Sequence, residues 1–366
     1  MSDTAAIFFV LACAAFSACA TWLSIHYAHR RRLLDMPGQR RSHSVPTPRG
    51  GGVGIVAAVL AALAILAANG QMRLLGESTV AAVAIVAAVG WIDDHRGLSA
   101  RVRLAAHLVA VVVLYFHLFR FLVFLSTAPP FGGGAHAART LTAADYAIPS
   151  VIAIVFVLAN VWFVNLHNFM DGINGLLASQ AIFVFLALAW LVQGDNKLVL
   201  LLGAAAVAGF LPFNFPRARV FMGDVGSGAL GLLIAGAVVL QALSFHGSPF
   251  SGLIACSAFV ADATCTLLSR MLRGRRWYSA HREHLYQWLV RSGFSHARVV
   301  AFYMGWNLFV VVPVLYAVNR GTAPTSPPTG FAWTLAVYVL AAIVWIAAKR
   351  WCLKQAGHAK KARNIK

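Results

Sequence analysis

The sequence predicts an all-α polytopic integral membrane protein that forms a single transmembrane domain over residues 1–366. Composition is the first reason, because 60% of the residues are hydrophobic, 11% are charged and the mean hydropathy is +0.74. Soluble domains carry about a quarter charged residues. The second reason is about eleven apolar runs that could each cross roughly 30 Å of hydrocarbon. They lie at residues 5–26, 51–69, 77–92, 104–126, 147–164, 176–193, 197–213, 228–244, 249–268, 298–318 and 331–348.

The first run ends in alanines, like a signal peptide. However, no basic residue precedes it and an arginine-rich segment follows it, so we expect a retained helix. The Lys and Arg residues predict the orientation of the chain in the membrane. All but five of the 30 Lys and Arg residues lie on one side when the loops are numbered alternately, which places the N-terminus outside and the C-terminus in the cytoplasm. Topology and anionic lipid therefore explain the net charge of +19, and no nucleic-acid partner is needed.

The polar motifs fall in the loops assigned to the cytoplasm, at residues 27–50, 93–103, 165–176, 214–228 and 270–298. The densest is a polar island between two apolar runs, which holds Asn165, Asn168, Asp171 and Asn174 with two glycines. A charged residue within a membrane helix costs about 2.5–3.5 kcal/mol on insertion scales. Amide and carboxylate oxygens suit magnesium or a phosphorylated ligand. The alternative is a polar turn between two helices.

Two further motifs carry carboxylates. Asp93 and Asp94 close the third run, and adjacent carboxylates repel unless a cation or a base lies between them. They could serve a divalent metal or act as a general base, although a charged helix end with Arg partners is the alternative. The glycine-rich segment 221–228 leads into the eighth run, where backbone N–H groups could bind an anion beside Asp224.

The first and last cytoplasmic loops are basic. Pro and Gly residues stiffen the first loop, whose Arg and His residues could meet a lipid phosphate. In the last loop His281 and His284 suggest zinc, but no further His or Cys pair completes a tetrahedral site. Arg282 with His284 suits a diphosphate better, and basic decoration of the membrane surface is the alternative. Asp262, inside the ninth run, could be a structural partner or a site residue.

Most of the acidic residues therefore lie on or near the cytoplasmic face. This arrangement fits phosphoryl transfer with a magnesium ion, in which positioning and charge neutralisation supply most of the catalysis. The residues concerned are Asp35, Asp93, Asp94, Asp171, Asp224, Asp262 and Glu283.

With these motifs in order, the sequence resembles the polyprenyl-phosphate N-acetylhexosamine-1-phosphate transferases over nearly its whole length. The matching motifs are Asp35–Gly52 with Thr47-Pro48-Arg49, the Asp93-Asp94 pair with Arg103, Asn165/Asn168/Asp171-Gly172, and Phe221–Ser227. The resemblance implies that a polyprenyl phosphate attacks the β-phosphorus of a UDP-sugar and releases UMP. It also implies magnesium, with manganese as a possible substitute, a bacterial inner-membrane location with the active site on the cytoplasmic face, and a homodimer.

By resemblance, Asp93 and Asp94 activate or position the lipid phosphate, and magnesium is held on the diphosphate. Phe221, Asp171 and Asn174 would surround the uridine, while Arg282 and His284 would bind the diphosphate or sugar. The expected catalytic residues are Asp93, Asp94 and Asp171, and the expected metal ligands are Asn168 and Asp224. The expected substrate-binding residues are Arg49, Arg103, Asn165, Asn174, Phe221, Arg282 and His284.

Two positions depart from the family pattern. Many members have Asp where this chain has Asn174, which puts a base role there in doubt, and Tyr286 and Gln287 follow His284 where a His-x-His run is usual. The late motif looks like the branch that starts O-antigen chains on undecaprenyl phosphate with 6-deoxy sugars such as N-acetylfucosamine or N-acetylquinovosamine. Two other functions stay open, a transporter of an anionic solute and a non-enzymatic polyprenyl-lipid binding protein. A transporter would place its site near the midplane, often in repeated halves.

Overall fold

The computed structural model describes residues 1–36, 45–71, 76–127, 143–244, 248–276, 281–319 and 327–364, and these residues are predominantly helical. Each of the apolar runs predicted from the sequence lies in helix, so the all-α class is confirmed. The helices are α1 (Asp3–Arg31), α2 (Val53–Ala68), α3 (Gly76–Arg96), α4 (Ala100–Thr127), α5 (Ala143–Phe169), α6 (Leu176–Leu191), α7 (Asp195–Asn214), α8 (Asp224–Ala242), α9 (Pro249–Ala255), α10 (Ser257–Met271), α11 (Leu285–Arg291), α12 (His296–Trp306), the π-helix η1 (Asn307–Val311), α13 (Val312–Val318) and α14 (Pro327–Asn364).

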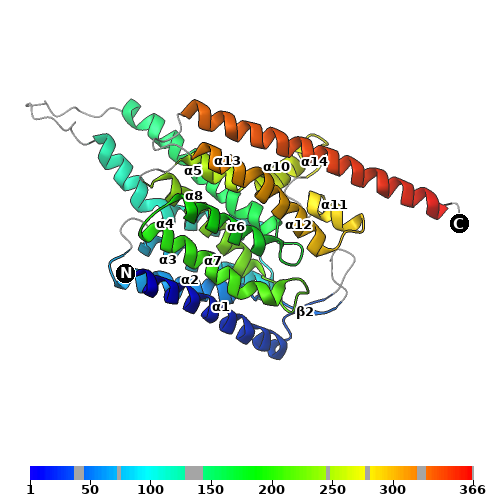
Figure 1. Cartoon of the computed structure of the whole chain (residues 1–366), viewed down its shortest axis with the longest axis horizontal. Coiled ribbons are helices and arrows are strands. Elements are labelled where there is room, and N and C mark those ends of the chain that lie inside the picture. Colours follow the sequence, from blue (N-terminus) through cyan, green and yellow to red (C-terminus); the bar gives the residue numbers. More distant parts are fainter. Residues whose placement is uncertain are drawn as a thin grey trace, which may run out of the picture.

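Within the described ranges, seven helices are long and apolar enough to cross a membrane, and a bent pair makes an eighth. The apolar helices α2 and α6 are shorter and fall outside this set, and the total of eleven crossings and the orientation stay predictions. Figure 1 shows the N-terminus and the C-terminus at opposite ends of the helical bundle. Opposite ends are what an odd number of crossings requires.

The ninth predicted run is not one straight helix. It divides into α9 and α10, which meet at a 72° bend next to Cys256. Neighbouring helices bond to the polar groups at the bend: Gln180 Nε2 donates to the Ala255 carbonyl at 3.4 Å, and Trp306 Nε1 donates to Ser257 Oγ at 3.1 Å. A break of this kind is tolerated in a membrane where surrounding protein satisfies the backbone.

α1 and α14 run along opposite edges of the helical bundle (Figure 1). α7 and α8 are mostly buried, and their Ala and Gly residues let neighbouring backbones approach closely. α1 and α14 instead expose large apolar side chains, among them Phe8, Trp22 and Ile343. Exposed apolar surface of this kind suits contact with lipid rather than water.

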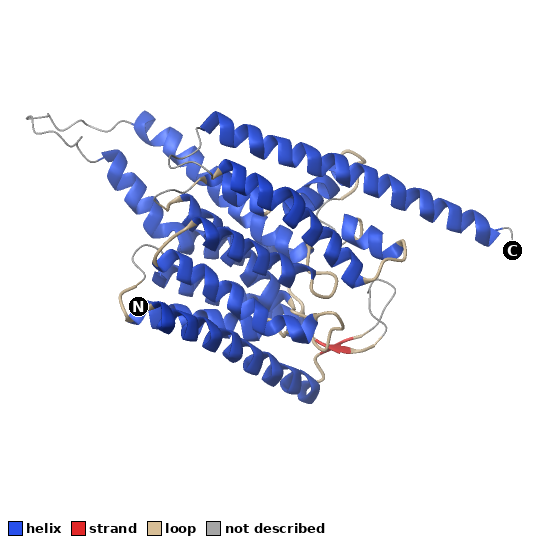
Figure 2. Ribbon diagram, viewed as in Figure 1, coloured by secondary structure: helices blue, strands red, loops and turns tan. Residues whose placement is uncertain are grey.

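A two-stranded antiparallel sheet of β1 (Leu34–Asp35) and β2 (Thr47–Pro48) in the first loop was not predicted (Figure 2). Strands of two residues are too short to give a periodic sequence signal. After β2 the backbone joins the segment before α8, because Phe221 N donates to the Pro48 carbonyl at 2.8 Å and Gly51 N donates to the Phe221 carbonyl at 2.9 Å. These bonds lie on either side of Arg49 and hold its backbone against the segment before α8. The predicted phosphate contacts of Arg40, Arg41 and His43 lie outside the described residues.

Candidate active site

A polar pocket of about 270 Å³ lies where the predicted cytoplasmic loops meet. Its walls come from the first loop, the turn between α5 and α6, the segment before α8, the last loop and the start of α12. Motifs that are widely separated in sequence therefore share one cavity. The lining residues are Asp35, Arg49, Asn168, Asp171, Gly172, Ile173, Asn174, Phe221, Gly223, Asp224, Arg282, Gln287 and His296.

Charges of both signs meet around Asp224. Arg49 and Arg103 each bring a guanidinium nitrogen to 3.8 Å from Asp224 Oδ2, and Arg103 Nη1 lies 2.9 Å from Asp93 Oδ2. Asp93 also accepts a hydrogen bond from the Leu98 amide. Asp93 and Arg103 thus lie directly behind Asp224 without being part of the pocket wall. Two cations and neighbouring carboxylates at one edge suit a ligand that brings both phosphate and metal.

Asp94 has a different environment from Asp93. Its Oδ1 accepts from the Asp224 amide at 3.0 Å and its Oδ2 accepts from the Val225 amide at 3.1 Å, while Arg49 Nε lies 3.1 Å from Oδ1. The side chain is only 3% exposed. Asp94 therefore caps the N-terminus of α8, where a negative charge is favoured by the helix dipole.

This cap changes the interpretation of the glycine-rich segment. The sequence suggested that its free amides would bind an anion, but the Asp94 carboxylate already occupies the amides of Asp224 and Val225. Gly223 adopts φ +77°, and a Cβ there would also collide with Asp94. The segment thus serves close packing of backbone against Asp94 rather than an anion site at the helix end.

The pKa of Asp171 is raised more than that of Asp224, the other carboxylate beside it on the pocket wall. Removal from bulk water and the nearby charge of Asp224 raise the pKa of Asp171 to about 7, against the opposing effect of Arg49. None of the described residues donates a hydrogen bond to its carboxyl group. Asp171 can therefore exchange a proton near neutral pH or pair with an incoming cation.

The neighbouring turn holds Asn174 in the pocket. Asn174 Nδ2 donates to the Pro216 carbonyl at 3.2 Å, and its backbone amide donates to His296 Nδ1 at 3.4 Å. Asn165, on the same motif, is placed elsewhere. It lies one helical turn earlier on α5, donates to the Val161 carbonyl at 2.8 Å and hydrogen-bonds His107. Asn165 is not among the residues that line the pocket, so its predicted contact with substrate would need a movement of α5.

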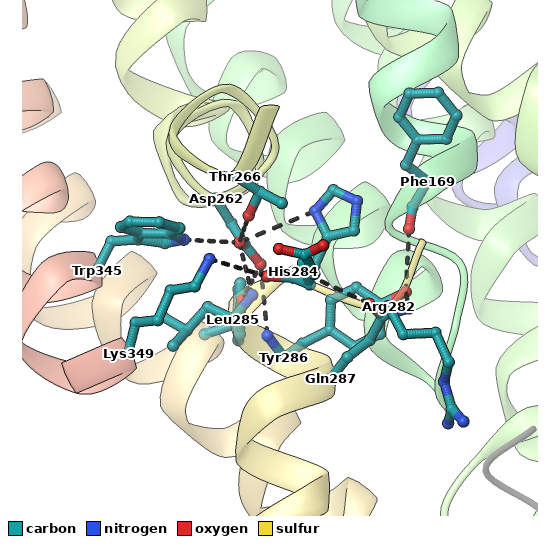
Figure 3. A network of polar contacts seen from close by, with 12 residues as sticks. Phe169, Asp262, Thr266, Arg282, His284, Leu285, Tyr286, Gln287, Trp345 and Lys349 are labelled. Carbon is teal, nitrogen blue, oxygen red and sulfur yellow. Dashed lines mark hydrogen bonds and ion pairs between the residues drawn. The ribbon is translucent and has the colours of Figure 1, made fainter. Parts of the chain in front are cut away.

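His284 also lies away from the pocket, because it faces inward. The side chain is 3% exposed and its Nδ1 lies 4.0 Å from Asp262 Oδ1 (Figure 3). Burial lowers the pKa of His284, which favours the neutral imidazole. Arg282, two residues earlier, instead extends away from Asp262 (Figure 3) and lines the pocket. Of the predicted pair for a diphosphate, only Arg282 reaches the cavity.

Six wall residues were absent from the predicted site residues, and three of the six have polar side chains: Asp35, Gln287 and His296. Asp35 belongs to the first motif, but its place in the pocket depends on the β1–β2 pairing. His296 begins α12 directly after its N-cap Ser295, where nothing in the sequence distinguishes it from an ordinary helix start. Gln287 stood out only as a departure from the usual late motif.

The donor atoms suit a hard cation only together with a ligand. No three His, Cys, Asp or Glu side chains within the described ranges are arranged to hold a metal by themselves. Asn168 and Asp224 nevertheless both line the pocket, and each side chain carries oxygen atoms. Magnesium is commonly bound by one or two carboxylates together with substrate phosphates, so this donor set fits it.

Comparison with known proteins identifies relatives of this chain. Residues 77–242 match the family model for glycosyl transferase family 4. A decaprenyl-phosphate N-acetylglucosaminephosphotransferase of Mycobacterium tuberculosis is 31% identical over 312 residues, which cover 76% of this chain and 74% of the relative. A probable undecaprenyl-phosphate N-acetylglucosaminyl 1-phosphate transferase of Bacillus subtilis is 28% identical over 77% of this chain and 76% of its own. A phospho-N-acetylmuramoyl-pentapeptide-transferase of Deinococcus radiodurans is 34% identical over 53% of this chain and 62% of its own.

Proposed function

Because this chain belongs to glycosyl transferase family 4, among the polyprenyl-phosphate N-acetylhexosamine-1-phosphate transferases, we propose that it transfers an N-acetylhexosamine 1-phosphate from a UDP-sugar to undecaprenyl phosphate. The observation that carries the proposal is the shared pocket, in which Arg49, Asp171, Asp224 and Arg282 meet although they come from separate loops. A cavity lined by both cations and carboxylates suits a metal-bound diphosphate better than an apolar or singly charged ligand.

In the proposed reaction, an oxygen of the lipid phosphate forms a bond to the β-phosphorus of the donor. The bond from that phosphorus to the bridging oxygen breaks, and UMP leaves with the bridging oxygen. Magnesium or manganese, held by Asn168 and Asp224, would neutralise charge on the diphosphate. Arg49 and Arg282 would bind phosphate oxygens, and Asp171 would take up a proton if the lipid phosphate arrives protonated.

The surroundings of Asp93 and Asp94 suggest different tasks for the two residues. Asp94 is engaged by two backbone amides and Arg49, so we assign it to holding the start of α8 against α3. Asp93 bonds to Arg103 beside Asp224, so it is the better candidate for positioning the lipid phosphate. Direct attack by an ionised lipid phosphate requires no base.

The choice of sugar is part of the proposal. The late motif with Tyr286 and Gln287 favours a 6-deoxy sugar such as N-acetylfucosamine or N-acetylquinovosamine, and hence the start of O-antigen or another cell-surface polysaccharide. Two of the relatives named above carry N-acetylglucosamine in their names, so UDP-N-acetylglucosamine is the competing donor. We place the pocket on the cytoplasmic face of a bacterial inner membrane, where UDP-sugars are available, and expect a homodimer.

The test is UMP release from purified protein incubated with undecaprenyl phosphate, magnesium and a panel of UDP-N-acetylhexosamines. We expect release that needs both the lipid and the metal, and the best donor identifies the sugar. Asp224→Asn should abolish release. Asp195→Asn is the matched control, because Asp195 begins α7, outside the pocket, and should leave the rate unchanged.

Absence of release with every donor would refute the transferase proposal. Transport of an anionic solute or binding of polyprenyl lipid without turnover would then be the remaining functions. Equal loss in Asp224→Asn and Asp195→Asn would contradict the assignment of this pocket as the site.

A further inference from the structure

Asp262 is buried, and both oxygens of its carboxylate accept hydrogen bonds. It lies in α10, is 2% exposed and accepts hydrogen bonds from three other parts of the chain as well as from its own helix (Figure 3). Both oxygens have at least two donors, so Asp262 ties α10, α12 and α14 to the start of α11. The donors are Leu285 N at 2.8 Å, Trp345 Nε1 at 3.0 Å and Thr266 Oγ1 at 3.2 Å to Oδ1, and Tyr303 OH at 2.6 Å and Tyr286 N at 3.5 Å to Oδ2.

Tyr286 links the hydrogen bonds of Asp262 to the polar pocket. Its hydroxyl group donates to the Phe169 carbonyl at 3.0 Å and accepts from Gln287 Nε2 at 3.1 Å (Figure 3). Phe169 is the last residue of α5, directly after Asn168 and two residues before Asp171. The Tyr286 side chain is 1% exposed, so water cannot readily replace either hydrogen bond.

The fit between Tyr286 and the α5–α6 turn is close. A Cβ added to Gly172 would overlap the Tyr286 hydroxyl group, so the turn can pass the ring only because Gly172 has no side chain. Gly172 and Gln287 both line the pocket, and Tyr286 lies between them. The ring therefore sets the spacing between the wall that carries Asn168 and Asp171 and the wall that carries Gln287.

We propose that Tyr286, held in place by Asp262, is a positioning residue for donor binding. It contacts none of the groups that would react. Instead it locks α11 to the end of α5, so that Arg282 and Gln287 face Asn168 and Asp171 across one pocket. The kinetic test of this inference rests on the proposed function, whereas its structural test does not.

Tyr286→Phe is the sharpest variant, because it keeps the ring and removes only the hydroxyl group. The variant removes two hydrogen bonds, of which the one to the Phe169 carbonyl joins α11 to α5. Loss of that one neutral hydrogen bond corresponds to about a 3- to 10-fold change in an equilibrium. We therefore expect the KM for the best UDP-N-acetylhexosamine of the panel to rise about 3- to 10-fold, with the KM for undecaprenyl phosphate unchanged. The matched control is Tyr338→Phe, which removes the 2.9 Å hydrogen bond from the Tyr338 hydroxyl group to the Leu253 carbonyl. Both residues lie far from the pocket residues in sequence.

Hydrogen exchange gives the readout that does not depend on activity. The amides of Met170 and Asp171 close the end of α5 by bonding to carbonyls of preceding residues. Tyr286→Phe should speed their exchange about 3- to 10-fold, while Tyr338→Phe should leave it as in the wild type. If Tyr286→Phe fails to fold, Tyr303→Phe replaces it, since it removes only the hydroxyl donor to Asp262.

The outcomes separate the two proposals. Faster exchange at Met170 and Asp171 without turnover of any donor in the wild type would refute the proposed function and support the role of Tyr286. Turnover with unchanged donor KM and unchanged exchange in Tyr286→Phe would overturn the positioning role. Equal changes in Tyr286→Phe and Tyr338→Phe would overturn it as well, because any lost hydroxyl group would then have the same effect.

Discussion

Asp94 and Asp224 are both acidic residues of the predicted site, yet the structure predicts opposite consequences for their removal. Asp94→Ala deprives the Asp224 and Val225 amides of their acceptor, and a buried donor without a partner costs about 1–3 kcal/mol. The ion pair with Arg49 adds little, because the Arg49 side chain is 39% exposed. The free energy of unfolding should therefore fall by about 2–5 kcal/mol in Asp94→Ala. Asp94→Asn keeps one acceptor and should lose about half as much.

Asp224→Asn should lose activity without a comparable loss of stability. Its side chain makes ion pairs at 3.8 Å with two Arg side chains that are 39% and 35% exposed. It also hydrogen-bonds Asp93, and the Asn amide can keep that bond by donating to the Asp93 carboxylate. Such pairs contribute roughly 0–1 kcal/mol. The assay is thermal unfolding of the purified proteins in detergent, followed by tryptophan fluorescence, together with UMP release. An unchanged Tm in Asp94→Ala, or an equally lowered Tm in Asp224→Asn, would refute the assignment of Asp94 as the cap of α8.

Three further expectations concern packing, pH and the α5 motif. Gly52→Ala should strongly lower the Tm because a Cβ there overlaps the backbone of α8, whereas Gly236→Ala meets its nearest atom at 3.8 Å and should not. Burial lowers the pKa of His284 in the folded protein, so the unfolded chain binds a proton more readily than the folded protein does. The free energy of unfolding should therefore fall as the pH falls below the unfolded pKa of about 6.5. His284→Leu should flatten that part of the Tm–pH curve. Asn165→Ala should leave the donor KM nearly unchanged, while Asn168→Ala should raise it, and the reverse order would contradict the placement of Asn168 on the pocket wall.

The composition and the apolar runs were sufficient to predict the fold class, and the polar residues within apolar surroundings predicted part of the pocket. Asn168, Asp171 and Asp224 stand out because a polar group next to a membrane-spanning run needs a partner or a ligand. The same reasoning selected Asp94, and the basic last loop suggested His284. Neither argument could tell a residue that faces a ligand from one that bonds within its own protein. That distinction depends on which helix end lies against α3 and which loop covers α10.

Asp35, His296 and the bend at Cys256 could not be predicted for a related reason. The position of Asp35 depends on a two-residue strand, and that of His296 depends on how α12 meets the α5–α6 turn. The bend depends on partners such as Gln180 and Trp306 that come from other helices. Each of these features arises from contacts between segments distant in the sequence, which local patterns do not encode.

The spread of the pocket walls along the chain has a consequence for synthesis. Arg49 comes early in the polypeptide, while Arg282, Gln287 and His296 come late. A membrane protein is inserted from its N-terminus onward, so a partly made chain already carries Asp171 and Asp224 but lacks the wall that faces them. The pocket is therefore complete only when the last loop has been translated and α11 has docked on α5.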